Sequence, residues 1–471
     1  MSRGGNSWWA GGLAVGAIAC VALPAATIPA RGQTLESALM QAYRNNPTLN
    51  SQRASVRATD EGVPQALSGY RPRVSITASA GEQYWDTLTK ASTTSSVYTK
   101  QSGTMTPSGY GLTTTQTLFN GFQTANRTRQ AEAQVLAARA TLRVTEQTVL
   151  LSAVTAYMNL LRDSAIFDLQ RRNVEVLQEQ LRQTRDRFNV GEVTRTDVAQ
   201  SESRLAAGRS QVLLAESNYK SSGATYRQVI GSNPGKLSPG TPVDRFSPPN
   251  LPGAVGFASA SHPAVVTAQY NIDVAQMQVK VAEGALYPTL SLQGNVQKSY
   301  ESSLTSLQTF NASVLGQLSV PIYQGGAEYS AIRQAKETLG QKRLDFDTAR
   351  DQVRQTVVQS WGQLDAAKAN IDATTAQVQA AEIAVNGVRE EARVGQRTTL
   401  DVLNVQQELV NARVALVTAQ RDRVVASYTL LSAVGRLAPQ VLGLRVPVYN
   451  PQVHYEQVRD NWAGVRTPDG R

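Results

Sequence analysis

An internal duplication constrains this chain more than any other feature of its sequence. Residues 70–76 (YRPRVSI) align with residues 286–292 (LYPTLSL), and residues 190–198 align with residues 394–402, where both copies begin Val-Gly and end Asp-Val. Such self-similarity indicates one structural unit built twice. The two copies meet at a segment that holds six of the nineteen prolines. The predicted organisation is a leader, a first repeat, a linker, a second repeat and a C-terminal tail: residues 1–32, 33–231, 232–256, 257–439 and 440–471.

Each repeat contains a long stretch without proline, which permits an unusually long helix. No proline occurs between residues 108 and 233 or between residues 322 and 438. Residues 122–190 and 327–394 are therefore predicted to be single helices, each about 100 Å long at a rise of about 1.5 Å per residue. The second shows the four-three spacing of a coiled-coil seam, with apolar residues that include Val353, Val357, Leu364, Ile371, Val378 and Val385.

Shorter helices are predicted on either side of each long helix. Return helices run on to Gly231 and Gly435, and opening helices cover residues 34–69 and 257–286. The opening helices contain prolines that should bend or break them: Pro47, Pro64 and Pro263. Two short helices stacked end to end match the height of one long helix, so each repeat should supply two columns.

Between the opening and the long helices, the sequence changes to a period of two. Apolar and polar residues alternate over residues 74–81, 290–297 and 310–320, and more weakly over the Thr-rich residues 108–119. This pattern predicts two β-hairpins, each with one apolar and one polar face and each joined by a loop rich in Ser and Thr.

The four strands pose a problem of burial, because the sequence offers no second apolar layer to cover them. Lipid would cover an apolar face, but a sheet in lipid must close into a barrel so that no edge stays unpaired. Bacterial transmembrane barrels have at least about eight strands, so a dimer or a trimer is required. The predicted fold is an α+β membrane protein, in which copies of the chain form a transmembrane β-barrel and the helices continue the pore as a helical tube. The alternative is a periplasmic coiled-coil adaptor or scaffold without a pore.

The residue inventory argues against enzymatic chemistry. Histidine occurs only at His262 and His454, so neither a zinc site nor a histidine-dependent relay has enough side chains. His262 is expected to cap a helix, and His454 lies in the tail, which should pack outside the helical barrel. Residues 231–238 resemble a phosphate-binding loop but have the wrong spacing. The net charge is +10 without a run of five like charges, so no nucleic-acid partner is expected. The residue inventory predicts no cofactor and no metal.

Residues 1–32 have the layout of a secretory signal peptide. Arg3 precedes an apolar stretch over residues 8–23, and small residues follow. The single cysteine, Cys20, lies inside this segment, and Ala17 stands where a lipid-attachment motif usually has leucine. We therefore expect ordinary cleavage, which leaves an exported chain without cysteine.

The doubled motifs resemble a known family. The L-E-S-A-L sequence from Leu35, the N-N-P sequence ending at Pro47 and the paired V-G-x-x-x-x-x-D-V segments are similar to those of the TolC family of outer-membrane exit ducts. The resemblance covers residues 33–440. It implies a homotrimer with a twelve-stranded transmembrane β-barrel in outer-membrane lipid, four strands per chain, continued by a periplasmic α-helical barrel. It also implies two partners, a periplasmic adaptor and an inner-membrane ABC or other transporter. The implied function is a passive conduit for type I protein secretion, multidrug efflux or both. The missing lipid-attachment cysteine favours protein secretion.

Two turns interrupt the helices at Val190-Gly191 and Val394-Gly395. Glycine readily takes the left-handed conformation that ends a helix, and Asp197 and Asp401 are placed to cap the helices that follow. The residues thus predict two helix turns. In the TolC family, the corresponding turns form the periplasmic tip that contacts the adaptor and closes the channel entrance.

The resemblance also implies a gate at this tip. Arg397 and Asp401 fall on the positions of a gating arginine and a pore-constricting aspartate, and Asp197 on the acidic position that pairs with the arginine. We expect an Asp197–Arg397 pair to hold the tip shut. Two departures weaken a constriction by charge, because Asn404 replaces a second pore aspartate and Ala392 replaces a gating tyrosine.

Overall fold

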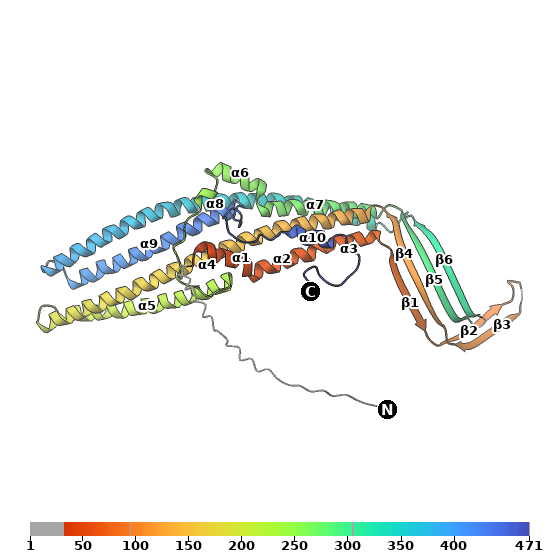
Figure 1. The fold of residues 1–471 in the computed structure, drawn as a ribbon, viewed down its shortest axis with the longest axis horizontal. Helices are drawn as coiled ribbons and strands as arrows, with labels where there is room; N and C mark the ends of the chain where they lie inside the picture. The colour runs from red at the N-terminus through yellow and green to blue at the C-terminus, as the bar shows by residue number, and fades with distance from the viewer. Residues whose placement is uncertain (1–32, 95, 304–305, 471) are drawn as a thin grey trace, which may run out of the picture.

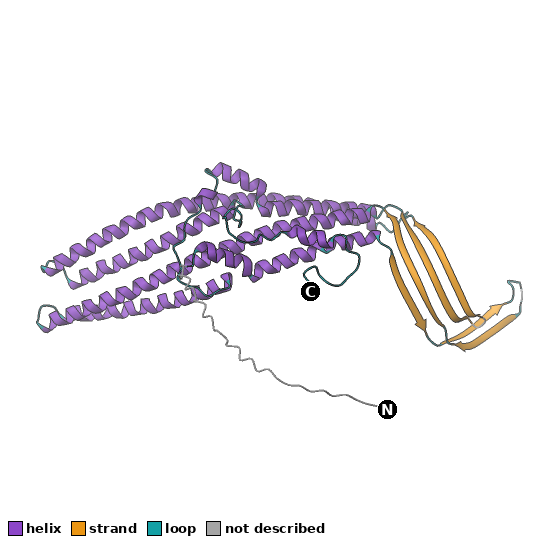
Figure 2. Cartoon of the chain, viewed as in Figure 1, coloured by secondary structure: helices purple, strands orange, loops and turns teal. Residues whose placement is uncertain are grey.

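The molecule is elongated, with a bundle of helices at one end and a sheet at the other (Figure 1). The computed structural model describes residues 33–94, 96–303 and 306–470. The predicted signal peptide and Cys20 lie outside these residues. Figure 2 shows the segregation of the two kinds of structure, with strands confined to the end opposite the helical tip. Within the described residues, no helix combines the length and the apolar character needed to cross a membrane.

The helices follow the predicted pattern of two very long and several shorter elements. Both long helices, α4 and α8, contain 67 residues. The bounds are α1 Leu35–Asn45, α2 Pro47–Asp60, α3 Gly62–Leu67, α4 Gln123–Asn189, α5 Arg195–Ile230, α6 Leu251–Ser261, α7 Pro263–Gly284, α8 Ala327–Arg393, α9 Thr399–Ala433 and α10 Pro451–Val458. Short 3₁₀ turns occur at Ser68–Tyr70 and Asp244–Phe246.

Prolines break the opening helices where the sequence predicts breaks. The side chain of Asn46 accepts hydrogen bonds from the backbone of Thr48 and starts α2 at Pro47. In the second repeat, Nδ1 of His262 accepts from the backbone N–H of Ala264 at 3.1 Å and starts α7. His262 is therefore a helix cap, as predicted. The short helices lie end to end beside the long ones (Figure 1).

The linker is shorter than predicted, because α6 begins at Leu251 inside residues 232–256. Its first turn contains Pro252, and a proline in a first helical turn has no hydrogen bond to lose. Asn250 caps this helix through its side chain, which accepts from the backbone N–H of Gly253 at 2.8 Å. The proline signal that marks the linker is thus also a helix start.

Four strands form one antiparallel sheet in the order β1-β4-β5-β6. Their bounds are β1 Arg73–Ala80, β4 Ser108–Asn120, β5 Thr289–Ser303 and β6 Ser306–Ser319. The register pairs Ile76 with Leu112, Leu112 with Val296, and Val296 with Ala312. These apolar residues therefore share one face, which confirms the predicted strands and their alternation.

A second hairpin corrects the prediction for the first Ser- and Thr-rich connection. Residues Gln83–Lys90 form β2 and Tyr98–Met105 form β3, a separate antiparallel pair at the far end of the molecule (Figure 1). Glu301 on β5 accepts hydrogen bonds from the backbone N–H and the hydroxyl of Thr106, at 3.0 and 2.7 Å. The base of this hairpin is therefore joined to the main sheet.

Left-handed residues turn the chain from sheet to helix. Gly121 and Phe122 have φ angles of 63° and 61° before α4, and Gly325 and Gly326 occupy the equivalent place before α8. A side chain at Gly121 would clash with the backbone of Gly284 on α7. Glycine at this turn thus lets the two repeats approach each other below the sheet.

The largest apolar core lies partway along the bundle, where α1, α4, α5 and α9 meet the linker. Its fully buried members include Leu39, Leu150, Tyr157, Tyr226 and Leu431. The hydroxyl of Tyr157 lies 2.7 Å from the carbonyl oxygen of Gln33 and 2.6 Å from that of Ser238. The start of the first repeat and the linker are thus held against α4.

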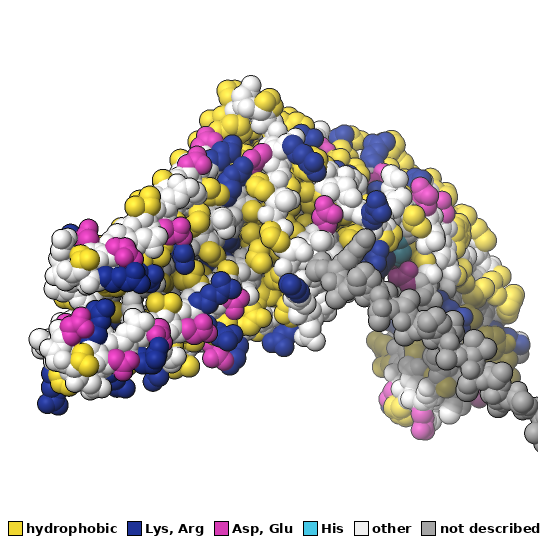
Figure 3. All heavy atoms as spheres, turned by 60° about the vertical axis from the view of Figure 1, so that its left-hand side comes forward, with side chains coloured by type: hydrophobic (Ala, Val, Ile, Leu, Met, Phe, Trp, Pro, Cys, Tyr) yellow, Lys and Arg dark blue, Asp and Glu magenta, His cyan; other side chains and the backbone are white. Residues whose placement is uncertain are grey.

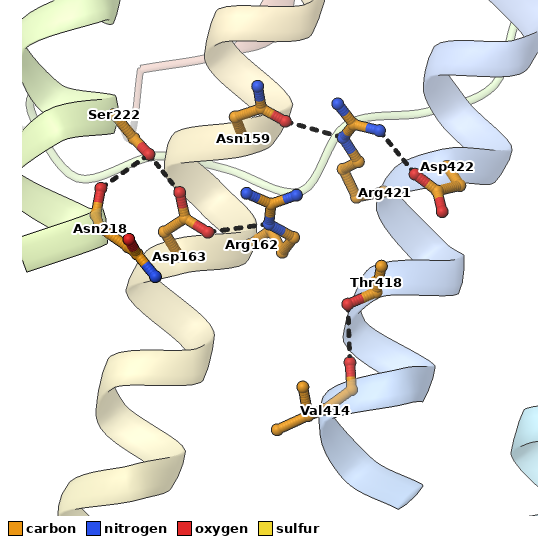
Figure 4. A network of polar contacts seen from close by, with 9 residues as sticks. All are labelled: Asn159, Arg162, Asp163, Asn218, Ser222, Val414, Thr418, Arg421 and Asp422. Atoms are coloured by element: carbon orange, nitrogen blue, oxygen red, sulfur yellow. Dashed lines mark hydrogen bonds and ion pairs between the residues drawn. The ribbon is translucent and has the colours of Figure 1, made fainter. Parts of the chain in front are cut away.

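A polar network beside this core joins the two repeats (Figure 4). Nε of Arg421 on α9 donates to Oδ1 of Asn159 on α4 at 2.8 Å, and the same guanidinium contacts Asp422 at 2.6 Å. On the other side of α4, Asp163 accepts a hydrogen bond from Ser222 of α5. The helical hairpin α8–α9 is therefore anchored to α4–α5 at this level.

Candidate functional site: channel wall and entrance

The apolar face of the sheet is exposed to solvent in the single chain. Ile76 is 79 % exposed and Val314 is 74 % exposed, although both belong to regular strands. A continuous exposed apolar face of this kind marks an interaction surface. In transmembrane β-barrels, the strands turn such an apolar face toward lipid.

Aromatic side chains mark both ends of this face. At the end away from the helices, Tyr110, Lys298 and Phe310 are register partners, and Nζ of Lys298 lies 5.3 Å from the ring centre of Tyr300. At the helical end, the exposed aromatic residues are Tyr70, Phe122, Tyr287 and Tyr323. Aromatic girdles at both interfaces are typical of transmembrane strands.

The opposite face of the same sheet is polar. Nε2 of Gln293 donates to Oε1 of Gln317 at 2.8 Å, and the side chains of Thr113 and Asn295 lie 3.4 Å apart. These residues form hydrogen bonds across neighbouring strands. A sheet with one lipid-compatible face and one hydrated face has the two surfaces that a channel wall needs.

The tip of the helical bundle is built from two matching turns. Gly191 and Gly395 adopt φ angles of 79° and 77°, and the preceding Val190 and Val394 are 77 % and 71 % exposed. The valines therefore project from the end of the molecule. Charged side chains of both signs gather at this end of the helical bundle (Figure 3).

Each turn is followed by a capping box that fixes the start of the return helix. The carboxylate of Asp197 accepts from the backbone N–H of Thr194 at 2.9 Å, and that of Asp401 accepts from Thr398 at 3.0 Å. The backbone N–H and then the hydroxyl of Thr398 lower the pKa of the Asp401 carboxyl. Asp401 is therefore held ionised at the start of α9.

Arg397 and Asp197 line the same cleft, whose volume is roughly 1140 Å³. In the single chain the two side chains do not pair with each other. Nε of Arg397 donates to Oε2 of Glu391 at 2.9 Å, and Asp197 caps its own helix. Glu391 raises the pKa of the Arg397 guanidinium. The Asp197–Arg397 latch thus stays a prediction. Sequence reasoning missed Glu391, which carries no motif and is six residues from its partner.

The two residues that depart from the family pattern also lie at this tip. Ala392 lines the cleft. Asn404 on α9 accepts a hydrogen bond at Oδ1 from Nη2 of Arg204 on α5, at 2.7 Å. Arg204 is a second residue that sequence reasoning missed, since it is 200 positions away from its partner.

The remaining candidates give no catalytic centre. Within the described ranges, no three His, Cys, Asp or Glu side chains come close enough to bind a metal ion. Nδ1 of His454 lies 3.0 Å from Oδ2 of Asp60, so this histidine packs the tail against α2.

Wall and tip together fit one class of protein: an outer-membrane export channel whose helices extend the duct into the periplasm. The sequence profile of the family described as outer membrane efflux protein matches residues 38–232 and 255–436. The chain belongs to this family, which includes TolC.

Individual relatives agree with this assignment. The chain is 43 % identical to the outer membrane efflux protein BepC of Brucella suis, over 94 % of each chain. It is 26 % identical to the outer membrane protein TolC of Escherichia coli, over 88 % of this chain and 84 % of that protein. The crystal structure of the Campylobacter jejuni outer membrane channel CmeC has the same fold, with a TM-score of 0.74 at 16 % identity, over 90 % of this chain and 89 % of that one.

Proposed function

We propose that three copies of this chain close into one channel. The observation that carries the proposal is the sheet, whose apolar face is exposed and whose outer strands β1 and β6 each have one hydrogen-bonded neighbour among the described strands. Pairing β6 of one copy with β1 of the next satisfies both edges. Three copies give twelve strands around a lumen lined by the polar face.

The channel is a passive conduit for an export system. Val190 and Val394 at the exposed tip dock to a periplasmic adaptor, with Gly191 and Gly395 shaping the turns. The adaptor connects the tip to an inner-membrane ABC or other transporter, which supplies the energy. The names of relatives support efflux, since BepC is described as an outer membrane efflux protein.

The entrance closes through charged groups at the tip. Asp401 contributes one carboxylate per copy. Arg397 pairs with Asp197 when the tip is closed and returns to Glu391 when the tip opens. The exchange of one carboxylate partner for another keeps the arginine paired in both states. Such an exchange costs little free energy, because exposed ion pairs contribute about 0–1 kcal/mol each.

Detergent extraction of the outer membrane tests the channel against the alternative of a periplasmic scaffold without a pore. The channel is expected in the outer-membrane fraction as a trimer that resists SDS until heated. Recovery of the chain in the soluble periplasmic fraction would favour the scaffold. Cargo is then assigned by deleting the gene and measuring drug sensitivity and secreted protein in the same strain.

A further inference from the structure

Arg204 places a positive charge beside the entrance, at the level where the TolC family has a second acidic residue. Its Nη2 atom donates to Oδ1 of Asn404 at 2.7 Å, which links the first repeat to the second. Asn404 follows Asp401 by three residues on α9, a rise of about 4.5 Å along a helix. The guanidinium of Arg204 therefore contacts α9 about one helical turn beyond Asp401.

Apolar packing fixes this arrangement. Leu403, which precedes Asn404, is 2 % exposed and packs against Leu177, Leu181 and Leu205 of the other helical hairpin. Leu205 directly follows Arg204 in the sequence. Both partners of the hydrogen bond are thus anchored by a buried neighbour, so the guanidinium has a defined position.

The hydrogen bond also stands apart from the polar contacts nearer the middle of the bundle. Arg421 joins the repeats further along α9, through Asn159 (Figure 4). Between the two links lies a cleft of about 340 Å³ between α4 and α9, lined by Asn173, Gln406 and other residues. The contact at Arg204 is therefore local to the tip.

Arg204 differs from those tip arginines that pair with carboxylates. Arg185 contacts Glu202 at 2.6 Å, and Arg393 and Arg397 contact Glu390 and Glu391 at 3.2 and 2.9 Å. Arg204 donates instead to a neutral amide, as Arg389 does to Gln406 at 2.9 Å. An amide partner adds no negative charge that would offset the guanidinium.

We propose that Arg204 determines the ionic selectivity of the entrance. Basic and acidic groups lie one turn apart there, so anionic solutes and acidic segments of cargo pass as readily as cationic ones. This inference rests on the proposed function, since it places Asp401 at the lumen. A charge one turn away acts within the Debye length of about 8 Å at physiological ionic strength, so the Asp401 carboxylates do not act alone on a passing ion.

Reversal potentials in planar bilayers under a KCl gradient test the proposal. Arg204→Gln is expected to raise the permeability ratio of K⁺ to Cl⁻ roughly threefold or more, because one of the positive charges that oppose the Asp401 carboxylates is then lost. Arg397, which also acts on Asp401, is unchanged in this variant. Arg204→Lys keeps the charge and should retain the wild-type ratio. Arg209→Gln is the matched control, because it removes the same charge from an exposed position of α5. Equal ratios for wild type and Arg204→Gln would overturn the proposal.

Asn404→Asp provides a second arm that does not depend on losing Arg204. The new carboxylate would pair with the adjacent guanidinium, so this variant alone should raise the ratio less than the double variant Arg204→Gln/Asn404→Asp. Equal permeability ratios for the single and double variants would show that Arg204 does not neutralise the carboxylate at position 404. That result would also overturn the proposal.

Asp401→Asn tests the position of the entrance separately from the role of Arg204. A lowered cation preference in Asp401→Asn, with no effect of Arg204→Gln, overturns the inference about Arg204 and leaves the entrance in place. No effect of Asp401→Asn overturns the assignment of the entrance as well. SDS-resistant trimers in each variant show that the channel has assembled.

Discussion

Nδ1 of His454 lies 3.0 Å from Oδ2 of Asp60, a fully buried carboxyl that precedes it by 394 residues. This contact joins the C-terminal helix α10 to α2. Arg139 on α4 lies 3.9 Å from the other carboxyl oxygen, and its guanidinium lies 5.1 Å from the ring centre of Tyr455. The tail is thus fastened to two helices of the first repeat at one buried point.

Removal of His454 should release the tail. His454→Ala leaves the buried Asp60 without its nearest partner, at an expected cost of about 1–3 kcal/mol for the docked tail. We expect trypsin to cleave faster after Arg459, and mass spectrometry of the fragments measures the rate. His454→Asn keeps a hydrogen-bond donor near the position of Nδ1 and should show a smaller effect. Unchanged cleavage of His454→Ala would show that the contact does not hold the tail.

The Asp60 carboxyl predicts a dependence of stability on pH. Burial raises its pKa above the ordinary value of 3.8, against the opposing effects of His454 and Arg139. The folded state therefore holds this proton more tightly than the unfolded state, and the stabilisation is complete below the ordinary pKa and lost as pH rises through the raised value.

Asp60→Asn cannot ionise, so it should gain stability relative to wild type between about pH 4 and pH 7. Urea unfolding of both proteins across this range measures the difference. Asp469→Asn, which changes an exposed acid of the tail, serves as the control. A wild-type advantage that grows with pH would contradict the expected sign.

The glycine turn of the second repeat is expected to be sensitive to substitution. Gly395→Ala meets no atom within 4 Å, so its cost is that of a left-handed backbone alone, about 1–2 kcal/mol. Gly387→Ala, in the C-terminal part of α8, also has open space, and it should stabilise that helix by about 0.5–1 kcal/mol. Hydrogen exchange at the tip measures both. Equal exchange rates in the two variants would contradict the role of the turn.

The proposed latch predicts opposite effects of two substitutions at the tip. Arg397→Ser removes the cation and should increase the single-channel conductance, because the tip is no longer held shut. Glu391→Gln removes the partner that competes within the chain, so Arg397 should pair more often with Asp197 and the open fraction should fall. If Arg397→Ser leaves the conductance unchanged, the latch is wrong.

Much of the fold follows from patterns that lie close together in the sequence. The stretches without proline predict α4 and α8, the alternation predicts the four strands, and the repeated glycines predict the tip. The hairpin β2–β3 could not be predicted in this way, because Tyr84 and Trp85 place large side chains on both faces and both are exposed. No burial imposes a period of two on such a segment.

The site shows the same limit. The sequence predicts Asp197 and Asp401 as the residues that cap the return helices, and both do take part in the caps. The N-cap residues themselves are Thr194 and Thr398, and each aspartate is the third helical residue of a capping box. The partners Glu391 and Arg204 depend on how helices meet at the tip, and no sequence pattern encodes that contact. Tertiary packing alone determines which carboxylate or amide an arginine reaches.

Cross-linking between strands β1 and β6 tests the closure of the sheet by copies of the chain. The only native cysteine is Cys20 in the predicted leader, so Ile76→Cys can be combined with a cysteine scanned along β6 from Gln308 to Leu318. Closure of a barrel staggers the strands, so the scan finds the level at which β6 of one copy meets β1 of the next. The register places Ile76 on the same face as Ala312 and Val314, so only positions on that face should cross-link on oxidation, and Ser313 should not. A closed ring of three copies gives a denaturing-gel ladder that ends at three chains. A ladder that ends at two chains, that continues beyond three, or that is absent at every position would contradict it.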